Sequence, residues 1–303
     1  MSRTTSPSTG RSYGLARVAR NWAVSCATVY RHRAGASTPP LRGPGPLGLC
    51  PHGELIEYIR QQILTLRFHG EGYRKIWGRL RHGGNRTSIC RVRRLMGAHR
   101  LLAPHWIGRR HTRVHDGTIV TEAVNTMWGT DMTETITLCE GVARVFIAVD
   151  HANSEVVSVH AAESGNCFEA LEPIRQGVLR HFGNIGPGVA AELKLRHDHG
   201  SNYMSGDSQA EIKCLGITSS PSFVREPEGN GMAERFIRTL KENFLWVHTF
   251  DTIKELRRAL IKFAHHYNET WLVGRHGHRT PAQVRTDQLR VDQMPVAELA
   301  LAA

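Results

Sequence analysis

An unbroken apolar run at residues 142–149 does most to limit the fold of this 303-residue chain. Such a run predicts a central strand that is covered on both faces, as in layered α/β proteins. Strands are predicted on either side of it, at 127–138 and 155–161. The elements predicted after them are a helix at 167–182, a strand at 193–198, a helix at 205–215, a short strand at 217–219, and helices at 228–245 and 251–267. Strands followed by alternating helices and strands predict a mixed α/β layer fold.

Asp131 lies within the predicted strand at 127–138. Apolar residues of one parity run along this strand: Trp128, Met132, Ile136 and Leu138. That alternation predicts one buried face, with Asp131 projecting from the opposite face. Taken alone, the aspartate could equally cap a turn.

Two more acidic residues stand in other settings. Asp198 ends a predicted strand, where the chain turns and a side chain can point out of the sheet end. Glu234 lies on the helix predicted at 228–245, at the edge of an apolar stripe. Arg238 and Lys241 share its side of that helix. The stripe consists of Ala233, Phe236, Ile237, Leu240 and Phe244. Carboxylates from three elements fit a site for magnesium-type ions, which prefer hard oxygen ligands.

Four segments around these acids resemble the integrase core of bacterial insertion-sequence transposases. The segments are residues 128–133, 198–203, 228–236 and 239–242, and Tyr267-Asn268 and Thr280-Pro281 extend the resemblance over about 54–285. The likeness is to the large family whose second reading frame encodes a retroviral-integrase-like catalytic subunit. Retroviral integrases also carry a zinc module with paired cysteines, and nothing in this sequence provides those cysteines, so the bacterial branch fits better.

The resemblance implies a ribonuclease H-like fold in which Asp131, Asp198 and Glu234 hold two Mg²⁺ or Mn²⁺ ions. It implies a DDE-type transposase that cuts transposon ends and joins them to a target. Lys241 matches the basic residue that such integrases place against their own DNA end, and Arg238 is a further candidate DNA contact. The implied partners are double-stranded DNA, as terminal inverted repeats and as target, and further copies of the chain. A protein from an upstream reading frame, or a fusion with it, is another, because relatives often carry a zipper there.

Composition agrees with a nucleic-acid partner. The chain carries 39 Lys and Arg against 27 Asp and Glu, a net charge of +12, which suits a polyanion. No apolar run approaches the ~18 residues of a membrane span, and the first residues lack a hydrophobic signal segment. The six cysteines form no Cys-x-x-Cys pair, so neither a zinc ribbon nor a disulfide framework is predicted. These features predict a cytoplasmic, nucleoid-associated bacterial protein without a membrane partner.

A helix-turn-helix-like segment is predicted at 1–35. Ser25 caps its second helix, and Arg31 and Arg33 make the end of that helix basic. The other predicted boundaries are a Pro/Gly-rich linker at 36–53, a helical DNA-binding domain at 54–104, a basic tether at 105–123, the integrase-like catalytic core at 124–285 and a C-terminal tail at 286–303.

The helical domain at 54–104 contains a capped helix at 87–96. Three basic residues lie on this helix: Arg91, Arg93 and Arg94. Such a helix fits a major groove, with its arginines in reach of phosphates or base edges. The competing interpretation is a solvated basic face on a structural bundle.

Single residues also have competing interpretations. Asp150 ends the strand at 142–149 and could bind a metal, but a hydrogen-bonding role at the strand end is favoured. His197 and His199 flank Asp198 and suggest zinc, although hard-cation sites prefer oxygen, so both are expected outside the coordination sphere. The rival functions are a non-catalytic DNA-binding regulator and a structure-specific nuclease on the same fold.

Overall fold

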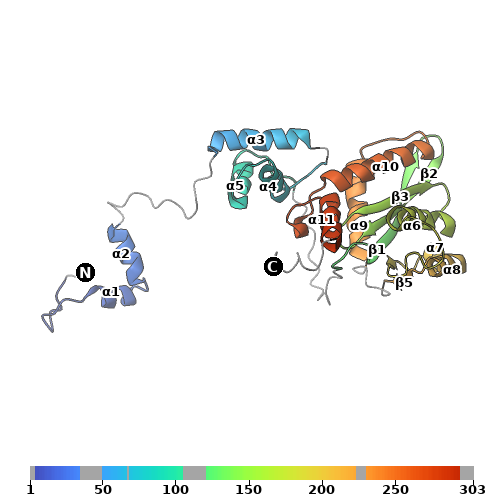
Figure 1. The fold of residues 1–303 in the computed structure, drawn as a ribbon. Coiled ribbons are helices and arrows are strands. Elements are labelled where there is room, and N and C mark those ends of the chain that lie inside the picture. Colours follow the sequence, from blue (N-terminus) through green and yellow to red (C-terminus); the bar gives the residue numbers. More distant parts are fainter. Residues whose placement is uncertain (1–3, 35–49, 67, 105–120, 223–229, 294–303) are drawn as a thin grey trace. The chain divides into compact units, whose positions relative to one another are not determined.

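The protein is seen here in a computed structural model that describes residues 4–34, 50–66, 68–104, 121–222 and 230–293 (Figure 1). Contacts divide the chain into two compact units, residues 1–47 and 48–303. The linker predicted at 36–53 and the tether predicted at 105–123 fall largely outside the described residues. The finer domain boundaries within 48–303 stay predictions.

The first unit contains two short helices joined by a turn, α1 (Leu15–Asn21) and α2 (Cys26–Ala34). The backbone N–H of Thr28 donates to Ser25 Oγ at 3.1 Å. This bond satisfies one of the free N–H groups at the start of α2. The serine cap predicted from the sequence is therefore present.

The second unit begins with three helices that pack around one apolar core, and we refer to them as the bundle. They are α3 (His52–Thr65), α4 (Tyr73–His82) and α5 (Ile89–Ala98). Their core consists of Leu55, Ile56, Ile59, Ile76, Leu80, Val92, Leu95 and Met96. Apolar residues recur every three or four positions on each helix, which gives each one a buried side. Ser88 caps α5 by accepting the Arg91 N–H at 3.2 Å.

A five-stranded mixed sheet forms the centre of the second unit. Its strands are β1 (Met127–Thr137), β2 (Gly141–Asp150), β3 (Val156–Ala162), β4 (Lys194–His197) and β5 (Thr218–Pro221). Their order is β3-β2-β1-β4-β5. The first three strands form an antiparallel meander, whereas β4 and β5 run parallel to β1. This arrangement confirms the mixed α/β, ribonuclease H-like class, and β2 is buried between two neighbours as its apolar run predicts.

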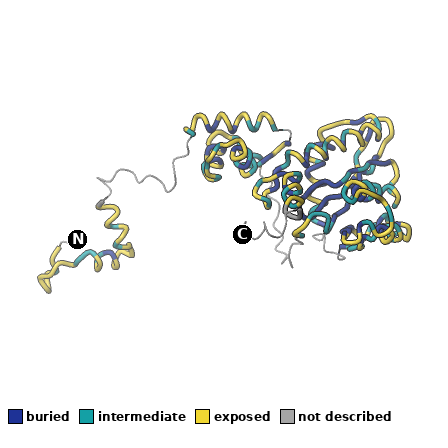
Figure 2. The backbone as a smooth tube through the Cα atoms, viewed as in Figure 1, coloured by how far each residue is buried: buried dark blue, intermediate teal, exposed yellow. Residues whose placement is uncertain are grey.

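Helices cover both faces of the sheet, whose strands are mostly buried (Figures 1 and 2). One face packs on α6 (Cys167–Phe182) and α8 (Gly206–Cys214). The other packs on α9 (Gly231–Leu240) and α10 (Ile253–Thr270). Helix α6 approaches closely because it has glycine at position 177, where a Cβ would overlap Val157 and the Trp128 ring. Three short helical elements and one further helix complete the described part of the unit: α7 (Ser201–Met204), η2 (Lys241–Leu245), η3 (Gly274–His276) and α11 (Pro281–Gln293).

The predicted buried face of β1 is wrong for its second half. Ile136 and Leu138 are 71% and 68% exposed, whereas Thr133 and Thr137, which share the parity of Asp131, are buried. Beyond its first three residues β1 pairs only with β2. The turn between β1 and β2 is bonded to the segment that precedes α10, because the Leu138 N–H donates a hydrogen bond to the Phe250 carbonyl. The face that carries Asp131 is therefore the face that packs beneath α9.

The helices near the C-terminal end of the core differ from the sequence prediction in two places. The helix expected to reach residue 245 is α-helical only to Leu240 and continues as the π-helix η2. Its wider turn brings both Phe244 and Leu245 into the core. Helix α11 crosses the boundary expected at 285, and Val284 within it is buried. The boundary itself stays a prediction.

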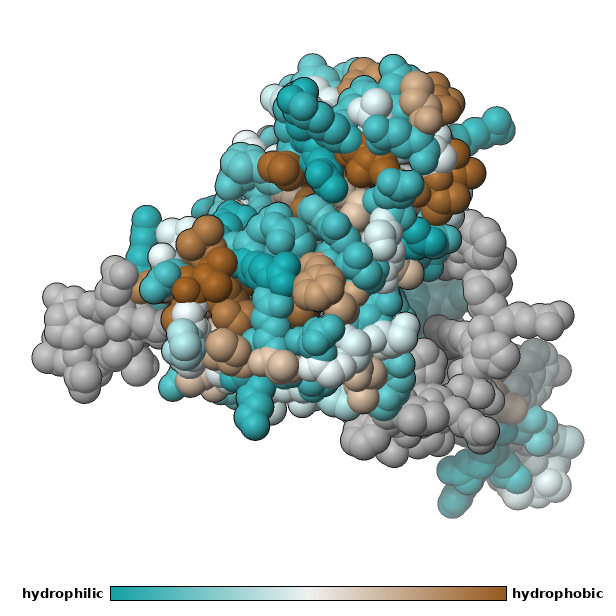
Figure 3. Space-filling model, turned by 90° about the vertical axis from the view of Figure 1, so that its right-hand side faces the viewer, coloured by the Kyte–Doolittle hydropathy of each residue, from teal (hydrophilic) through white to brown (hydrophobic). Residues whose placement is uncertain are grey.

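The surface mixes apolar and polar side chains. On the face shown in Figure 3, apolar side chains gather in several separate groups among hydrophilic ones. Of the helices in the described ranges, none is long and apolar enough to cross a membrane.

Candidate metal and nucleic-acid site

Strands β1 and β4 bring two of the three acids side by side. The strands pair in parallel, with Gly129 opposite Arg196. Continuing that register by two residues sets Asp131 opposite Asp198. Because β4 ends at His197, Asp198 lies just past its carboxyl end, where ligands commonly bind in α/β sheets.

Thr130, the residue before Asp131, connects β1 to the segment that follows Asp198. Its hydroxyl donates to the Ile147 carbonyl at 2.8 Å. Since a hydroxyl has one hydrogen, the Tyr203 hydroxyl, 2.9 Å away, donates to Thr130 Oγ1. Tyr203 is buried on α7. This pair fixes the turn after Asp198 against β1.

The backbone of Thr130 also holds the helix that carries Glu234. Its carbonyl accepts from Asn230 Nδ2 at 2.8 Å, and Asn230 is buried at the N-cap of α9. Glu234 follows one helical turn later and lies on the same side of the helix. The close approach needs glycine at position 129, because a Cβ there would lie 2.9 Å from Asn230 Oδ1.

Both aspartates accept hydrogen bonds from backbone N–H groups one or two residues further along the chain. Asp131 Oδ1 accepts from the Met132 N–H at 2.8 Å, and Asp198 Oδ1 accepts from the Gly200 N–H at 2.9 Å. Over the described ranges, no three His, Cys, Asp or Glu side chains are positioned to hold one metal ion as they stand. The carboxylates share one region of the fold, but they must turn before they can share an ion.

The electrostatics of Asp131 show that the three acids interact. Its pKa is raised to about 6, chiefly by burial and additionally by the negative charges of Asp198 and Glu234. The Met132 N–H bond and the positive charge of Lys241 oppose this rise. Burial also raises the pKa of Glu234. A set of hard oxygen donors that repel one another fits a divalent cation, which would relieve that repulsion.

The two histidines beside Asp198 are bonded within the protein. The ring of His197 is buried, with Nδ1 2.7 Å from the Asp198 carbonyl and Nε2 2.8 Å from Ser219 Oγ. His199 Nε2 lies 2.5 Å from the Ser222 carbonyl. Both therefore brace the end of β4 against the β5 side of the sheet. These contacts favour the expectation that neither binds the metal.

Asp150 has a structural role at the end of β2. Its carboxylate accepts the backbone N–H groups of Asn125 and Ala152, each at 2.7 Å. Arg285 on α11 lies 3.6 Å away. Although burial raises the pKa of Asp150, these donors satisfy its oxygens. The hydrogen-bonding interpretation of this residue is therefore supported over metal binding.

The two cations predicted beside Glu234 differ in their surroundings. Lys241 begins η2, and its charge acts on the Asp131 carboxylate. Arg238 is exposed, and its Nε donates to Glu242 at 2.8 Å, one turn further on. Lys241 is thus the better candidate for a phosphate bound at the acidic site.

The three arginines of α5 also differ. Arg91 is half-buried, and its Nη2 donates to the Cys50 carbonyl at 2.6 Å and lies 3.2 Å from His52 Nδ1. It joins α5 to the start of α3. Arg94 Nη2 also lies 3.3 Å from His52 Nε2, but Arg93 and Arg94 are exposed, which leaves them better placed for DNA than Arg91.

In the first unit, Arg31 and Arg33 are exposed in the last turn of α2. Arg31 Nε lies 3.4 Å from the Ala27 carbonyl of the preceding turn. Cations at this end of a helix complement its dipole. Their position suits both helix stability and contact with DNA.

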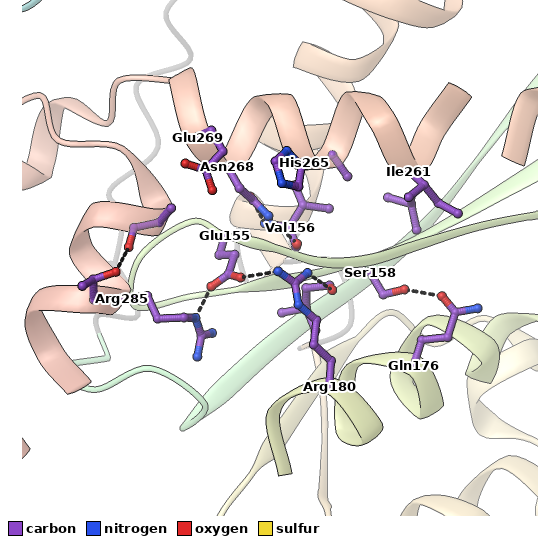
Figure 4. Close-up of a pocket in the computed structure, with 15 residues that line it drawn as sticks. Glu155, Val156, Ser158, Gln176, Arg180, Ile261, His265, Asn268, Glu269 and Arg285 are labelled. Atoms are coloured by element: carbon purple, nitrogen blue, oxygen red, sulfur yellow. Dashed lines mark hydrogen bonds and ion pairs between the residues drawn. The ribbon is translucent and has the colours of Figure 1, made fainter. Parts of the chain in front are cut away.

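A cavity of about 410 Å³ lies at the β3 edge of the sheet, between α6, α10 and α11 (Figure 4). In it Glu155 lies between Arg180 and Arg285, and Ser158 donates to Gln176 at 2.6 Å. None of the three acids lines this cavity. It is separate from the acidic site.

Sequence reasoning gave no role to Thr130, Tyr203 or Asn230. Each lies inside a segment that carries the family resemblance and within five positions of one acid. Their closeness to an acid within these segments is the sequence signal that could have identified them. The bonds that join them connect residues up to 100 positions apart, which a local pattern does not reveal.

Comparison with known proteins finds similarity to integrases and transposases. A family model described as an integrase core domain matches residues 215–281. The InsD transposase of insertion element IS2A/D/F/H/I/K from Escherichia coli is 27% identical over 219 residues, which cover 70% of this chain and 72% of the relative.

Solved structures of retroviral integrases are more distant in sequence. The catalytic core domain of BIV integrase is 17% identical, with 56% of this chain and 99% of that chain covered and a TM-score of 0.41. The HTLV-2 integrase catalytic core domain in complex with magnesium is 18% identical, with 53% and 96% covered and a TM-score of 0.40.

The sequence comparisons thus relate the chain to an integrase core domain and to an insertion-element transposase. Its similarity in sequence is to the transposases of insertion elements, and it spans 72% of the relative's length.

We expect Asp131→Asn to stabilise the metal-free protein at pH 7.5 by roughly 1–2 kcal/mol, after allowance for solvent screening. Burial raises the pKa of Asp131 to about 6, so the folded state retains its proton longer than the unfolded state does. That advantage is complete below the ordinary pKa of 3.8 and is lost as the pH rises through about 6. Urea unfolding should therefore show the gain at pH 7.5 and none near pH 4.

Glu134 on the same strand provides the control. Its carboxylate is exposed and lies 3.3 Å from Arg144, so Glu134→Gln should give no gain at either pH. An Asp131→Asn variant whose stability equals that of the unmodified protein at pH 7.5 would show that the charged Asp131 carboxylate does not destabilise the folded protein.

Proposed function

We propose that this protein binds the ends of an insertion sequence and, at the site of Asp131, Asp198 and Glu234, cleaves DNA phosphodiesters and joins the ends to a target. The observation that carries the proposal is the convergence of the three acid-bearing elements on Thr130. Gathered carboxylates repel DNA phosphates, so a protein that only binds DNA gains nothing from them. This argues against a non-catalytic regulator.

The donor set suits Mg²⁺ or Mn²⁺, and we infer two ions per site. Bound between the carboxylates and the phosphate, such ions supply Lewis-acid stabilisation of the attacking and leaving oxygens. The chain itself contributes the ligands and their spacing. Asp131 and Asp198 extend from neighbouring strands, and Glu234 comes from the helix above them.

Lys241 supplies positive charge beside these acids. A lysine that acts on the Asp131 carboxylate can bind a phosphate of the DNA end and orient it for in-line attack. No protein nucleophile is needed, because water and then a DNA 3′-hydroxyl attack the phosphorus. The proposed DNA partners are terminal inverted repeats and target DNA.

Joining two ends to one target requires more than one active site, so we propose that the chain acts as a homo-oligomer on DNA. A protein from an upstream reading frame, or a fusion with it, is a further proposed partner. The excess of positive charge, +12, suits close approach of several DNA segments.

Asp131→Asn, Asp198→Asn and Glu234→Gln should each abolish cleavage and joining while leaving end binding intact or stronger. Each change keeps the side-chain shape but removes one negative ligand, so metal affinity falls and repulsion from phosphates is relieved. Labelled end fragments, incubated with purified protein and Mg²⁺ or Mn²⁺, measure both chemical steps. Ca²⁺ should support binding with little or no chemistry.

The exposed Glu134→Gln serves as the matched acid control, and it should cleave at the unmodified rate. If any one of the three acid variants nicks and joins as well as this control, the proposed set of ligands is wrong. A regulator would show a different result, since none of the proteins, modified or not, would cleave.

Lys241→Ala should reduce end processing by about 10- to 100-fold, the cost of losing one charge-assisted bond to phosphate. Its melting temperature should change little, because truncating a partly exposed helical side chain costs little stability. Lys254→Ala, an exposed lysine on α10, provides the control. Processing by the Lys241 variant at the rate of this control would remove Lys241 from the site.

Changing Arg93 and Arg94 together to Ala should weaken end binding and make its salt dependence shallower. Each lost phosphate contact reduces the slope of log K against log salt by roughly 0.9. Gel-shift titrations over a range of salt concentrations measure both effects. Arg60→Ala, at an exposed arginine on α3 that pairs with Glu57, should alter neither. An unchanged slope for the double variant would show that α5 does not contact DNA.

A further inference from the structure

Phe68, in the link between α3 and α4, packs outside the bundle. It is 2% exposed and belongs to the apolar core beneath α9 and α10. Its ring packs edge-to-face with the Trp271 ring, with the ring centroids 5.0 Å apart. It also stacks on the His266 ring, at a centroid distance of 5.2 Å. Edge-to-face and offset contacts of this kind add to the stabilisation from burial. Phe68 therefore joins the bundle to the helices of the catalytic core.

The residue after Phe68 bonds to the helix that continues from Glu234. The backbone N–H of His69 donates to Asn243 Oδ1 at 2.6 Å. Asn243 is buried in the π-helix η2, and its Nδ2 donates to the Thr239 carbonyl at 2.9 Å. One side chain thus joins the bundle link to the α9–η2 segment, which carries Glu234 and Lys241.

Helix α4 rests directly on the end of α10 and on the segment that follows it. Arg79 donates from two nitrogens to the buried Glu71 carboxylate, at 2.7 Å each, and from Nη2 to the Thr270 carbonyl at 3.2 Å. A Cβ at Gly78 would lie 2.8 Å from His278 Cβ. The backbone of α4 at Gly78 therefore lies against the His278 side chain, with no room for a larger residue at position 78.

We infer that Phe68, with the contacts of α4 and Asn243, anchors the bundle on the core and so sets which phosphodiester is cut relative to the sequence that the bundle binds. This inference rests on the proposed function. Phe68 and Asn243 are positioning residues, since neither touches the three acids. A rigid anchor fixes the distance between the DNA-reading helix and the acidic site, and a mobile bundle leaves that distance undefined.

The first measurement is independent of chemistry. A variant that retains only Cys90 on α5 and Cys139 in the β1–β2 hairpin, both exposed, accepts two spin labels for distance measurement by double electron–electron resonance. The labelled full chain should give one narrow distance distribution. Adding Phe68→Ala or Gly78→Leu should broaden it. Equal widths with and without these changes would overturn the anchor, whether or not the protein cleaves DNA.

The second measurement maps cleavage on a labelled end at single-nucleotide resolution. The unmodified protein should cut at one phosphodiester, whereas Phe68→Ala and Gly78→Leu should cut over several neighbouring ones, with end affinity within about twofold of the original. Phe68→Leu, which retains apolar volume, should restore a single position. Cleavage by both disruptive variants at the unmodified position alone would contradict the inference.

Matched controls separate positioning from stability. Phe250→Ala removes another buried ring of the same apolar core that contacts Phe244 and His248. It should lower the melting temperature and keep the single cleavage position. Gly97→Leu on α5, where a Cβ has ordinary contact with Leu102 at 3.7 Å, should keep both the narrow distance distribution and the single position. If the unmodified protein cuts no ends, the proposed function fails and the distance measurement alone decides the anchor.

Discussion

The acidic site depends on the hydrogen bonds of Thr130. Its hydroxyl accepts from Tyr203 and its carbonyl accepts from Asn230, so one residue beside Asp131 fixes both the turn after Asp198 and the helix that carries Glu234. These bonds are buried, and a buried polar group left without its partner costs about 1–3 kcal/mol. The positions of the three acids therefore depend on buried hydrogen bonds that are costly to break.

This arrangement opposes the repulsion among the carboxylates. Burial and the neighbouring negative charges hold the pKa of Asp131 at about 6, which means that the metal-free site carries unfavourable charge at neutral pH. The apolar side of α9, packed on β2 and α10, and the positive charge of Lys241 offset that cost. A site that is unfavourable when empty of cations and stable when it holds them suits an enzyme whose DNA and metal bind together.

Local patterns in the sequence predicted the elements and the acids, but they did not predict how the elements meet. The helix at 167–182 and the central strand were predicted because their apolar periodicity is strong, and Asp131, Asp198 and Glu234 were identified from short segments. The exposed Ile136 and Leu138 were mispredicted, because covering one half of β1 depends on residues near Phe250. The π-turn at Lys241 and the anchor at Phe68 were missed for the same reason. Asn243 and Phe68 find their partners more than 170 positions away in the sequence.

Crystals soaked in Mn²⁺ provide the most direct test that the three acids form one metal site. An anomalous difference map should show two peaks about 3.5–4 Å apart, one shared by Asp131 and Asp198 and one beside Glu234. The carboxylates of Asp131 and Asp198 should have turned away from the N–H groups of Met132 and Gly200. No anomalous peak at these carboxylates, or Mn²⁺ bound at His197 or His199 instead, would contradict the assignment.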